Sequence, residues 1–262
     1  MKSLPFFLSL LLVPTLVFGN QKAKELAISD STATNGAYHD PFDTGEATTV
    51  KPEVKVSDPL ERLNRTFFKF NDKFYFWFFK PVVTGYSAVV PKPARVCVNR
   101  FFINAEFPVR FVNNILQGKF KGAGYETGRF LVNTTVGVAG FFDPAKSWKL
   151  APHPADLDQT LGVHHIPTGI YFCWPVFGPS TVRGTVGTCG DSALTPWSYF
   201  CLPVSMGVPA YDMLNNGSLH AGEYEDLKKS TFDPYAALRS AYLENRQSLI
   251  EQQAGAGSSP TP

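Results

Sequence analysis

The sequence lacks the short motifs that mark the commonest catalytic sites. It contains no G-x-S-x-G, H-E-x-x-H, P-loop or G-x-G-x-x-G motif, which would supply a nucleophile, a zinc site or a phosphate cradle. Ser180, in the segment GPSTVRG, lacks the flanking glycines of a nucleophile elbow. The sequence therefore predicts a protein without enzymatic activity and without a cofactor.

Metal ligands are sparse as well. The four cysteines include no pair at the C-x-x-C spacing of structural zinc sites. His164 and His165 are adjacent, so their side chains point apart on either a helix or a strand. A metal site that joins them to His153 and Asp156 is the weaker interpretation, and we expect none.

Apolar runs long enough to cross a bilayer, about 20 residues, are also missing. The run from Leu4 to Phe18 is shorter, and Pro5 and Pro14 interrupt it. Because it follows a basic start and ends at small residues, we expect residues 1–19 to be a secretory signal peptide. A retained N-terminal anchor is the alternative.

Composition divides the rest of the chain. Residues 20–57 are rich in Ser, Thr, Ala and Asp without apolar periodicity, which is typical of a disordered linker. Residues 253–262 are expected to form a disordered tail. This leaves residues 58–252 as one folded domain, in which we find no internal repeat.

Positive charge is concentrated in the first part of this domain. Residues 58–130 hold twelve Lys or Arg against five Asp or Glu, whereas the whole chain has a net charge of only +2. Nine of the thirteen residues from Phe67 to Phe79 are aromatic. Basic and aromatic composition suits nucleic acid or anionic lipid, and the expected export signal argues against nucleic acid.

The segment DPLERLNRTFFKFNDKFYFWFFKP, residues 58–81, predicts an amphipathic helix. Asp58 is placed to cap it, Pro59 suits its first position and Glu61 suits a capping box. Arg62, Arg65, Lys69 and Lys73 share one side, and apolar residues occupy the opposite side. From this helix alone, a core helix of a soluble domain is the favoured interpretation. A membrane-bound helix is the alternative, and the residues that would then contact lipid are Phe67, Phe70, Phe74, Trp77 and Phe78.

Helices are expected along most of the remaining domain, so the fold class is mainly α. The segment 151–210 is crowded with Pro and Gly and is expected to be irregular, with weak strand signals throughout. A last helix is expected after Asp233 as cap and Pro234 at its first position. Among the cysteines, Cys189 and Cys201 are the closest pair for a disulfide, although four cysteines allow three connectivities.

An ordered set of short motifs gives the chain a resemblance to the MlaA/VacJ family. The first of them matches the pattern D-P-[LF]-E-x-x-N-R-x-x-F-x-F-N. The matches run from about residue 57 to 246 and are Asp58-Pro59, Asn64-Arg65, Phe68, Phe70, Asn71, Pro108, Asn113, Leu116-Gln117-Gly118, Arg129-Phe130, Asn133-Thr134, Gly137, Gly140, Asp143, Gln159-Thr160-Leu161-Gly162, Gly178-Pro179-Ser180-Thr181, Arg183, Gly187 and Asp233-Pro234-Tyr235.

This resemblance implies a ring of amphipathic helices embedded in the inner, periplasmic leaflet of the Gram-negative outer membrane, with a polar channel. It implies that misplaced phospholipids leave the outer leaflet through that channel. They would pass to a periplasmic lipid carrier that feeds an inner-membrane ABC transporter. A trimeric outer-membrane porin is the further implied partner. Residues that we expect at the channel or in its polar framework are Asn64, Asn71, Arg129, Asn133 and Arg183.

Three features depart from the family pattern. Members are commonly lipoproteins with a cysteine at the signal cleavage point, whereas the first cysteine here is Cys97, so we expect no acyl anchor. The family's Arg-Asp pair after the G-P-S-T turn is Arg183-Gly184 here. Asp158 and His164-His165 stand where the family usually has small or aromatic residues. A soluble periplasmic lipid carrier and a phospholipid hydrolase are the alternative functions.

Overall fold

The structure, a computed structural model, describes residue 56 and residues 58–256. The expected signal peptide at 1–19 and nearly all of the linker at 20–57 lie outside the described residues, as does the tail beyond residue 256. Within the described range the chain is mainly helical, as the sequence predicts. None of its helices there combines the length and the apolar content that crossing a membrane requires.

Thirteen helical elements and one hairpin of two strands make up the described part of the fold. In chain order they are α3 (Glu61–Phe74), η1 (Tyr75–Phe79), α4 (Lys80–Val89), α5 (Lys92–Ala105), α6 (Phe107–Leu116), α7 (Phe120–Thr135), α8 (Pro144–Ser147), α9 (Leu157–Val163), β1 (Tyr171–Trp174), β2 (Gly178–Thr181), α10 (Val182–Ser192), η2 (Pro196–Tyr199), α11 (Leu202–Leu219), α12 (Glu223–Ser230) and α13 (Pro234–Ala256).

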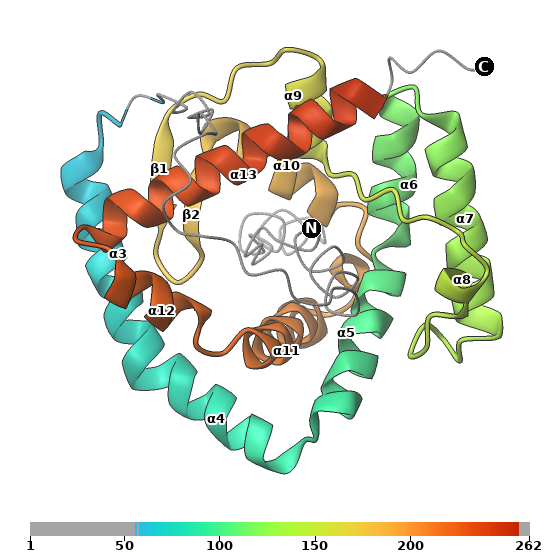
Figure 1. Cartoon of the computed structure of the whole chain (residues 1–262), viewed down its shortest axis with the longest axis horizontal. Coiled ribbons are helices and arrows are strands. Elements are labelled where there is room, and N and C mark those ends of the chain that lie inside the picture. The colour runs from blue at the N-terminus through green and yellow to red at the C-terminus, as the bar shows by residue number, and fades with distance from the viewer. Residues whose placement is uncertain (1–55, 57, 257–262) are drawn as a thin grey trace, which may run out of the picture.

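The helices follow one another around a ring (Figure 1). In that view α3 and α4 form one side, α5 and α6 form another, and α13 closes the circuit above them. The pair α7 and α8 lies outside the ring beside α6. Helix α11 is seen end-on, so its axis runs along the short dimension of the molecule, and it packs against α4 and α5.

The aromatic helix continues through a π-helical turn. Helix α3 passes directly into η1 and then into α4, and the N–H of Lys80 bonds to the carbonyl of Tyr75. In a regular α-helix the ring of Pro81 would clash with the carbonyl of Trp77, four residues earlier. The wider π turn immediately before Pro81 relieves that clash.

The start of α3 differs from the prediction. The helix begins at Glu61, its N-cap residue is Leu60, and no side chain caps it. Asp58 instead accepts hydrogen bonds from Asn64 Nδ2 at 2.7 Å and from the hydroxyl of Tyr235. The Asp58 carboxylate, which the local pattern assigned to helix capping, is therefore engaged in a tertiary contact with α13.

The segment rich in Pro and Gly is more regular than expected. It contains α9, α10, η2, the start of α11 and an antiparallel hairpin in which Tyr171 pairs with Thr181 and Trp174 with Gly178. Left-handed backbone at Val176 (φ 70°) and Gly178 (φ 83°) turns the chain between the strands. The strands are short and β2 carries Pro179, so propensity alone does not predict them.

Helix α13 begins as predicted and ends later than predicted. Asp233 accepts bonds from the N–H groups of Tyr235 (3.1 Å) and Ala236 (3.3 Å), as an N-cap does. The helix runs on to Ala256, past the expected domain end at residue 252. Gln253 is buried and donates to the carbonyl of Pro154 at 2.7 Å, so residue 253 belongs to the folded domain.

The distribution of polar and apolar side chains is inverted relative to that of an ordinary water-soluble domain. Buried polar or charged residues outnumber buried apolar ones in the described part, and one small apolar cluster is centred on Tyr171, Tyr235 and Leu243. Many large apolar side chains are exposed instead. Extensive exposed apolar surface marks contact with protein or membrane.

Candidate functional site

The α3–η1 segment exposes several of the aromatic side chains that the sequence singled out. Trp77 is 91% exposed, Phe78 is 58% exposed and Phe70 is 49% exposed. Phe74 is partly buried and lies between two of them, with its ring centroid 6.4 Å from that of Phe70 and 5.2 Å from that of Phe78. Phe67 is partly buried too. Phe70, Trp77 and Phe78 are therefore the members of the set that present free surface.

Not all the cations of α3 remain free at this surface. Arg65 donates to Asp233 at 2.8 Å and to Glu61 at 2.8 Å, and its guanidinium lies 4.5 Å from the ring centroid of Tyr235. The Arg65 hydrogen bond holds the pKa of the Asp233 carboxyl below its usual range. Arg65 thus ties α3 to α13, whereas Arg62, Lys69 and Lys73 are exposed.

Asn64 and Asn71 attach the hairpin to α3. Asn64 is fully buried, donates to the carbonyl of Tyr171 at 3.2 Å and accepts the N–H of Cys173 at 2.9 Å. Asn71 donates to the carbonyl of Trp174 at 2.8 Å and accepts the N–H of Val176 at 2.6 Å. The two amides, seven residues apart, satisfy backbone groups that one short hairpin leaves unpaired.

Arg129 and Asn133 hold the turn at α8. Both donate to Asp143, at 3.0 Å and 2.9 Å, and Asn133 also accepts the N–H of Ala145 at 3.1 Å. The Asp143 carboxylate caps the short helix through the N–H of Lys146. The structure places these two predicted residues in a buried framework between α7 and α8.

Arg183 belongs to a cluster of four charges, in which Arg183, Asp158 and Arg246 are buried and Asp156 is partly exposed. It donates to Asp158 at 2.8 Å and to the carbonyl of Ile166 at 3.0 Å. Arg246 of α13 donates to Asp156 at 2.8 Å and lies 3.3 Å from the second oxygen of Asp158. Two cations thus face two anions, so the cluster is electrically balanced.

Arg183 takes its acidic partner from another helix and not from the following position, which is Gly184. Asp158 of α9 supplies the carboxylate that pairs with Arg183. A Cβ atom at Gly184 would stand 2.9 Å from the hydroxyl of Tyr242, so this position has little room for a side chain.

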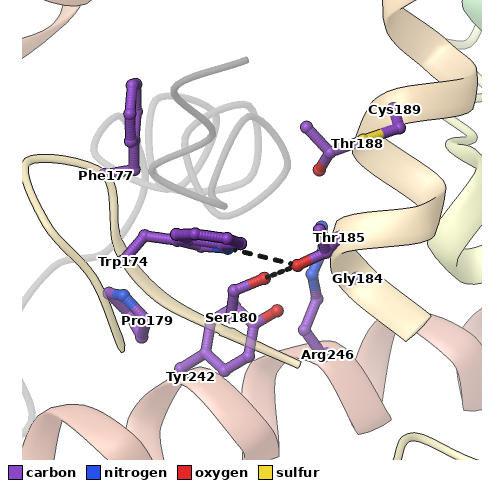
Figure 2. A pocket seen from close by; sticks show the side chains of 10 residues that line it. All are labelled: Trp174, Phe177, Pro179, Ser180, Gly184, Thr185, Thr188, Cys189, Tyr242 and Arg246. Atoms are coloured by element: carbon purple, nitrogen blue, oxygen red, sulfur yellow. Dashed lines mark hydrogen bonds between the residues drawn. The ribbon is translucent and has the colours of Figure 1, made fainter. Parts of the chain in front are cut away.

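A pocket opens between the hairpin, α10 and α13 (Figure 2). Its empty volume is about 460 Å³, including its open mouth. Trp174 and Phe177 come from the hairpin, and Tyr242 and Arg246 line the side formed by α13. The remaining polar lining includes Ser180, Thr185, Thr188 and the thiol of Cys189. Sequence reasoning missed this pocket, because it depends on how the hairpin folds onto the helices.

The four cysteines are free, so the suggested disulfide between Cys189 and Cys201 is not formed. Cys201 is exposed at the start of α11, while Cys189 lies in the pocket. Cys173 is buried in the hairpin, and burial raises the pKa of its thiol to about 11. A thiol that stays protonated at neutral pH is a poor nucleophile.

In the described residues, the side chains around Ser180 and the histidines do not form the arrangement that the weaker catalytic and metal interpretations require. Ser180 lies 3.1 Å from the hydroxyl of Thr185, and none of its hydrogen-bond partners is a histidine or an acid. His153 stacks on Tyr125, and His164 contacts the carbonyl of Leu116. Across residue 56 and residues 58–256, no three His, Cys, Asp or Glu side chains gather where a metal ion would bind.

Comparisons with known proteins agree with this architecture. The family model described as MlaA lipoprotein matches residues 56–249. The chain is 30% identical over 210 residues to the intermembrane phospholipid transport system lipoprotein MlaA of Haemophilus influenzae, covering 73% of this chain and 78% of that one. It is 32% identical over 195 residues to the protein of the same name from Escherichia coli K12, with 72% and 76% covered.

A solved structure gives the same result in three dimensions. That chain comes from work on the structural basis for maintenance of bacterial outer membrane lipid asymmetry. It superposes with a TM-score of 0.63 at 30% identity and covers 74% of this chain and 99% of the solved one. Both the family match and the structural match span nearly the whole described domain, and the chain therefore belongs to the MlaA lipoprotein family.

Proposed function

We propose that this protein carries out intermembrane phospholipid transport and so maintains the lipid asymmetry of the outer membrane. It removes phospholipid that is misplaced in the outer leaflet and passes it toward the periplasm through a polar path within the ring. The relatives named above support this reading, since they are named for that transport system.

The observation that carries the proposal is the inverted distribution of side chains. Large apolar residues such as Trp77 and Phe78 are exposed, while polar groups such as Asn64, Asn113, Glu126 and Arg183 are buried. Transfer of apolar surface from water into acyl chains is favourable by roughly 25 cal/mol per Å². A buried polar framework keeps the ring rigid within that environment.

The location that fits best is the periplasmic leaflet of the outer membrane. The aromatic side chains of the α3–η1 segment would lie among acyl chains, and the exposed Arg62, Lys69 and Lys73 would lie among headgroups. We propose that this segment anchors the protein in the membrane, because Phe70, Trp77 and Phe78 present exposed aromatic surface.

The proposed partners follow from the transport role. Phospholipid is the cargo, a trimeric outer-membrane porin is the membrane neighbour, and a periplasmic carrier that feeds an inner-membrane ABC transporter receives the lipid. The family resemblance supports these assignments. No covalent step is required, and we propose that the protein is not an enzyme.

Two measurements in one strain test the proposal. The gene is expressed in a Gram-negative strain that lacks its own MlaA protein, and surface-exposed phosphatidylethanolamine is measured with an impermeant amine-reactive probe. Restored low labelling, without release of fatty acid or lysolipid, supports transport. Membranes are then washed with high salt and with alkali, and the protein should remain in the outer-membrane fraction.

Other results would contradict specific parts of the proposal. Unchanged surface labelling despite normal expression would contradict the transport role. Recovery of the protein in the soluble periplasm would favour a diffusing lipid carrier. Lysolipid release that a Ser180→Ala substitution abolishes would favour the hydrolase alternative.

A further inference from the structure

Helix α12 joins α11 to α13 and buries none of its own side chains. Five of its eight residues are charged. In Figure 1 it lies on the inner side of α3 and α4. An isolated helix shorter than about 12 residues is only marginally stable in water, so α12 depends on the side-chain contacts that attach it to its neighbours.

The backbone at both ends of α12 permits movement. Gly222 has a φ of +103°, and a Cβ atom there would meet nothing within 4 Å, so the backbone conformation requires glycine and packing does not. At the other end the helix gives way to extended backbone at Thr231 (φ −121°, ψ 143°). The side chain of Phe232 is fully exposed. Neither Gly222 nor Phe232 is therefore held by close packing.

Two ion pairs attach α12 to the continuous segment of α3, η1 and α4. Nζ of Lys228 donates to both carboxylate oxygens of Asp72, at 2.7 Å and 2.9 Å. Nζ of Lys80 lies 2.9 Å from Oε1 of Glu225. All four side chains keep between 21% and 44% of their surface accessible. Salt ions in the solvent therefore screen both pairs.

Aromatic contacts complete the attachment. The hydroxyl of Tyr224 donates to Asp72 at 2.8 Å, and the Tyr224 ring centroid lies 4.9 Å from that of Tyr75. Nζ of Lys228 lies 4.7 Å from the ring centroid of Phe76. Helix α12 contributes no residue to the buried apolar cluster described above, so its release would leave that cluster intact.

We propose that α12 is a strap that ion pairs hold against η1 and that moves away, between Gly222 and Thr231, while the rest of the ring stays folded. Opening of the strap uncovers Tyr75 and Phe76, the rings of η1 that α12 contacts. The closed strap would slow the passage of phospholipid along the inner side of α3, and the open strap would speed it. This consequence rests on the proposed transport function, whereas the movement itself does not.

Hydrogen exchange measured by mass spectrometry tests the movement. The whole protein is purified in a nonionic detergent, and amide exchange in α12 is compared with that in α3 and α13, in low salt and in high salt. High salt is expected to speed exchange in α12 and to leave α3 and α13 unchanged, because screening weakens the two ion pairs.

A pair of substitutions at neighbouring lysines provides the matched comparison. Lys228→Met keeps the apolar stem and removes the charge, so exchange in α12 should rise about fivefold to tenfold, as expected for a partly exposed ion pair with a cation–π contact. Lys229→Met is the control, because Lys229 is 76% exposed and pairs with Asp226 inside α12, at 3.9 Å. It should change the exchange rate by less than about twofold.

A charge swap separates loss of the ion pair from damage to the fold. Asp72→Lys and Lys228→Asp each place like charges opposite one another and should speed exchange in α12. The double variant restores opposite charges at the two positions. It should exchange more slowly than either single variant.

Three results would overturn the inference: exchange in α12 that does not respond to salt, equal effects of Lys228→Met and Lys229→Met, or faster exchange that spreads equally through α3 and α13. The last result would make the ion pairs a structural tie of the whole ring. The strain assay described above keeps the two proposals separate. Restored lipid asymmetry without salt-dependent exchange in α12 removes the strap and leaves transport intact, and the reverse combination removes transport and leaves the strap.

Discussion

The N–H of Cys173 donates to Oδ1 of Asn64 across 2.9 Å, and neither residue is accessible to water to any useful extent. This bond joins the first described helix to a hairpin more than a hundred positions later in the chain. It fixes where the hairpin, and with it the pocket wall at Trp174, lies relative to the ring.

Replacing Asn64 by Leu should loosen the hairpin. The substitution leaves the N–H of Cys173 and the carbonyl of Tyr171 buried without this partner, and each unsatisfied buried group costs about 1–3 kcal/mol. We expect a lower free energy of unfolding and faster protease cleavage between residues 165 and 180. Thr66→Ala, on the exposed side of the same helix, is the control, and equal protease resistance of both variants would refute the prediction.

Substituting the exposed aromatic residues should weaken membrane association. Phe70, Trp77 and Phe78 are changed together to Ser; a fully buried aromatic side chain contributes roughly 1.5–3 kcal/mol, so binding to liposomes should fall at least a hundredfold. Flotation of purified protein with liposomes measures it, and circular dichroism verifies the helix content.

A second triple substitution, at the exposed cations of α3, separates the electrostatic from the apolar contribution to membrane binding. Arg62, Lys69 and Lys73 are changed together to Ser, which should reduce the salt dependence of binding and leave most of the affinity. If this variant lost more affinity than the aromatic one, attachment would be mainly electrostatic. The anchoring role of the aromatic residues would then be wrong.

The buried charges should be far more sensitive than surface charges. Asp158→Asn leaves Arg183 with a neutral partner and Arg246 with one carboxylate fewer, and loss of one member of a buried ion pair costs about 3–5 kcal/mol. Asp226→Asn removes an exposed carboxylate whose side chain is 80% accessible, where little change is expected. Denaturant unfolding in detergent compares the two, and similar midpoints would contradict the assignment.

Stability should fall as pH rises toward neutrality because of Asp191. Burial, followed by repulsion from Asp156, raises the pKa of this carboxyl from 3.8 to about 7, despite hydrogen bonds from Leu157 and Asn113. Between these values the folded state holds a proton that the unfolded state has lost, so folding is favoured at lower pH. The dependence approaches about 1.4 kcal/mol per pH unit and ends above pH 7.

Thermal unfolding between pH 5 and pH 8.5 measures this dependence. Asp191→Asn is expected to be less stable at every pH, because an amide nitrogen cannot accept the bond that a carboxylate oxygen accepts, but its curve should be flatter. Glu244→Gln, an exposed position of α13, should keep the slope of the unaltered protein. A slope that survives in Asp191→Asn would assign it to another group.

Two glycines near α7 should respond to alanine in opposite directions. At Gly140, where φ is +92°, a Cβ would stand 2.4 Å from Cβ of Asn104, so alanine adds both backbone strain and a clash. At Gly124, within α7, a Cβ meets nothing within 4 Å, so alanine should stabilise the helix by about 0.5–1 kcal/mol. Unfolding temperatures of the two variants check the difference in sign.

The local features of the chain were predictable from sequence. The 3.6-residue pattern of α3, the Asp233-Pro234 start of α13 and the unusual polar positions Asn64 and Asn71 are all written in short stretches. Local patterns predict such elements because a helix is stabilised by contacts between residues three and four apart.

Pairings between distant segments were not predictable in the same way. Asp58 satisfies the helix-cap pattern, yet it bonds to Asn64 and to Tyr235 of α13. The hairpin in the segment rich in Pro and Gly is stabilised by Asn64 and Asn71, whose backbone partners lie about a hundred residues away. Its own propensity is too weak to form it.

The sequence by itself determined the amphipathic aromatic helix, the mainly helical class and the family to which the chain belongs. The tertiary structure decided which aromatic residues are free, which carboxylate pairs with Arg183 and where a pocket opens. The physical reason is the distance along the chain between the residues that interact. Helix formation depends on neighbours along the chain, whereas ion pairs, buried amides and cavities depend on segments that only the closed ring brings together.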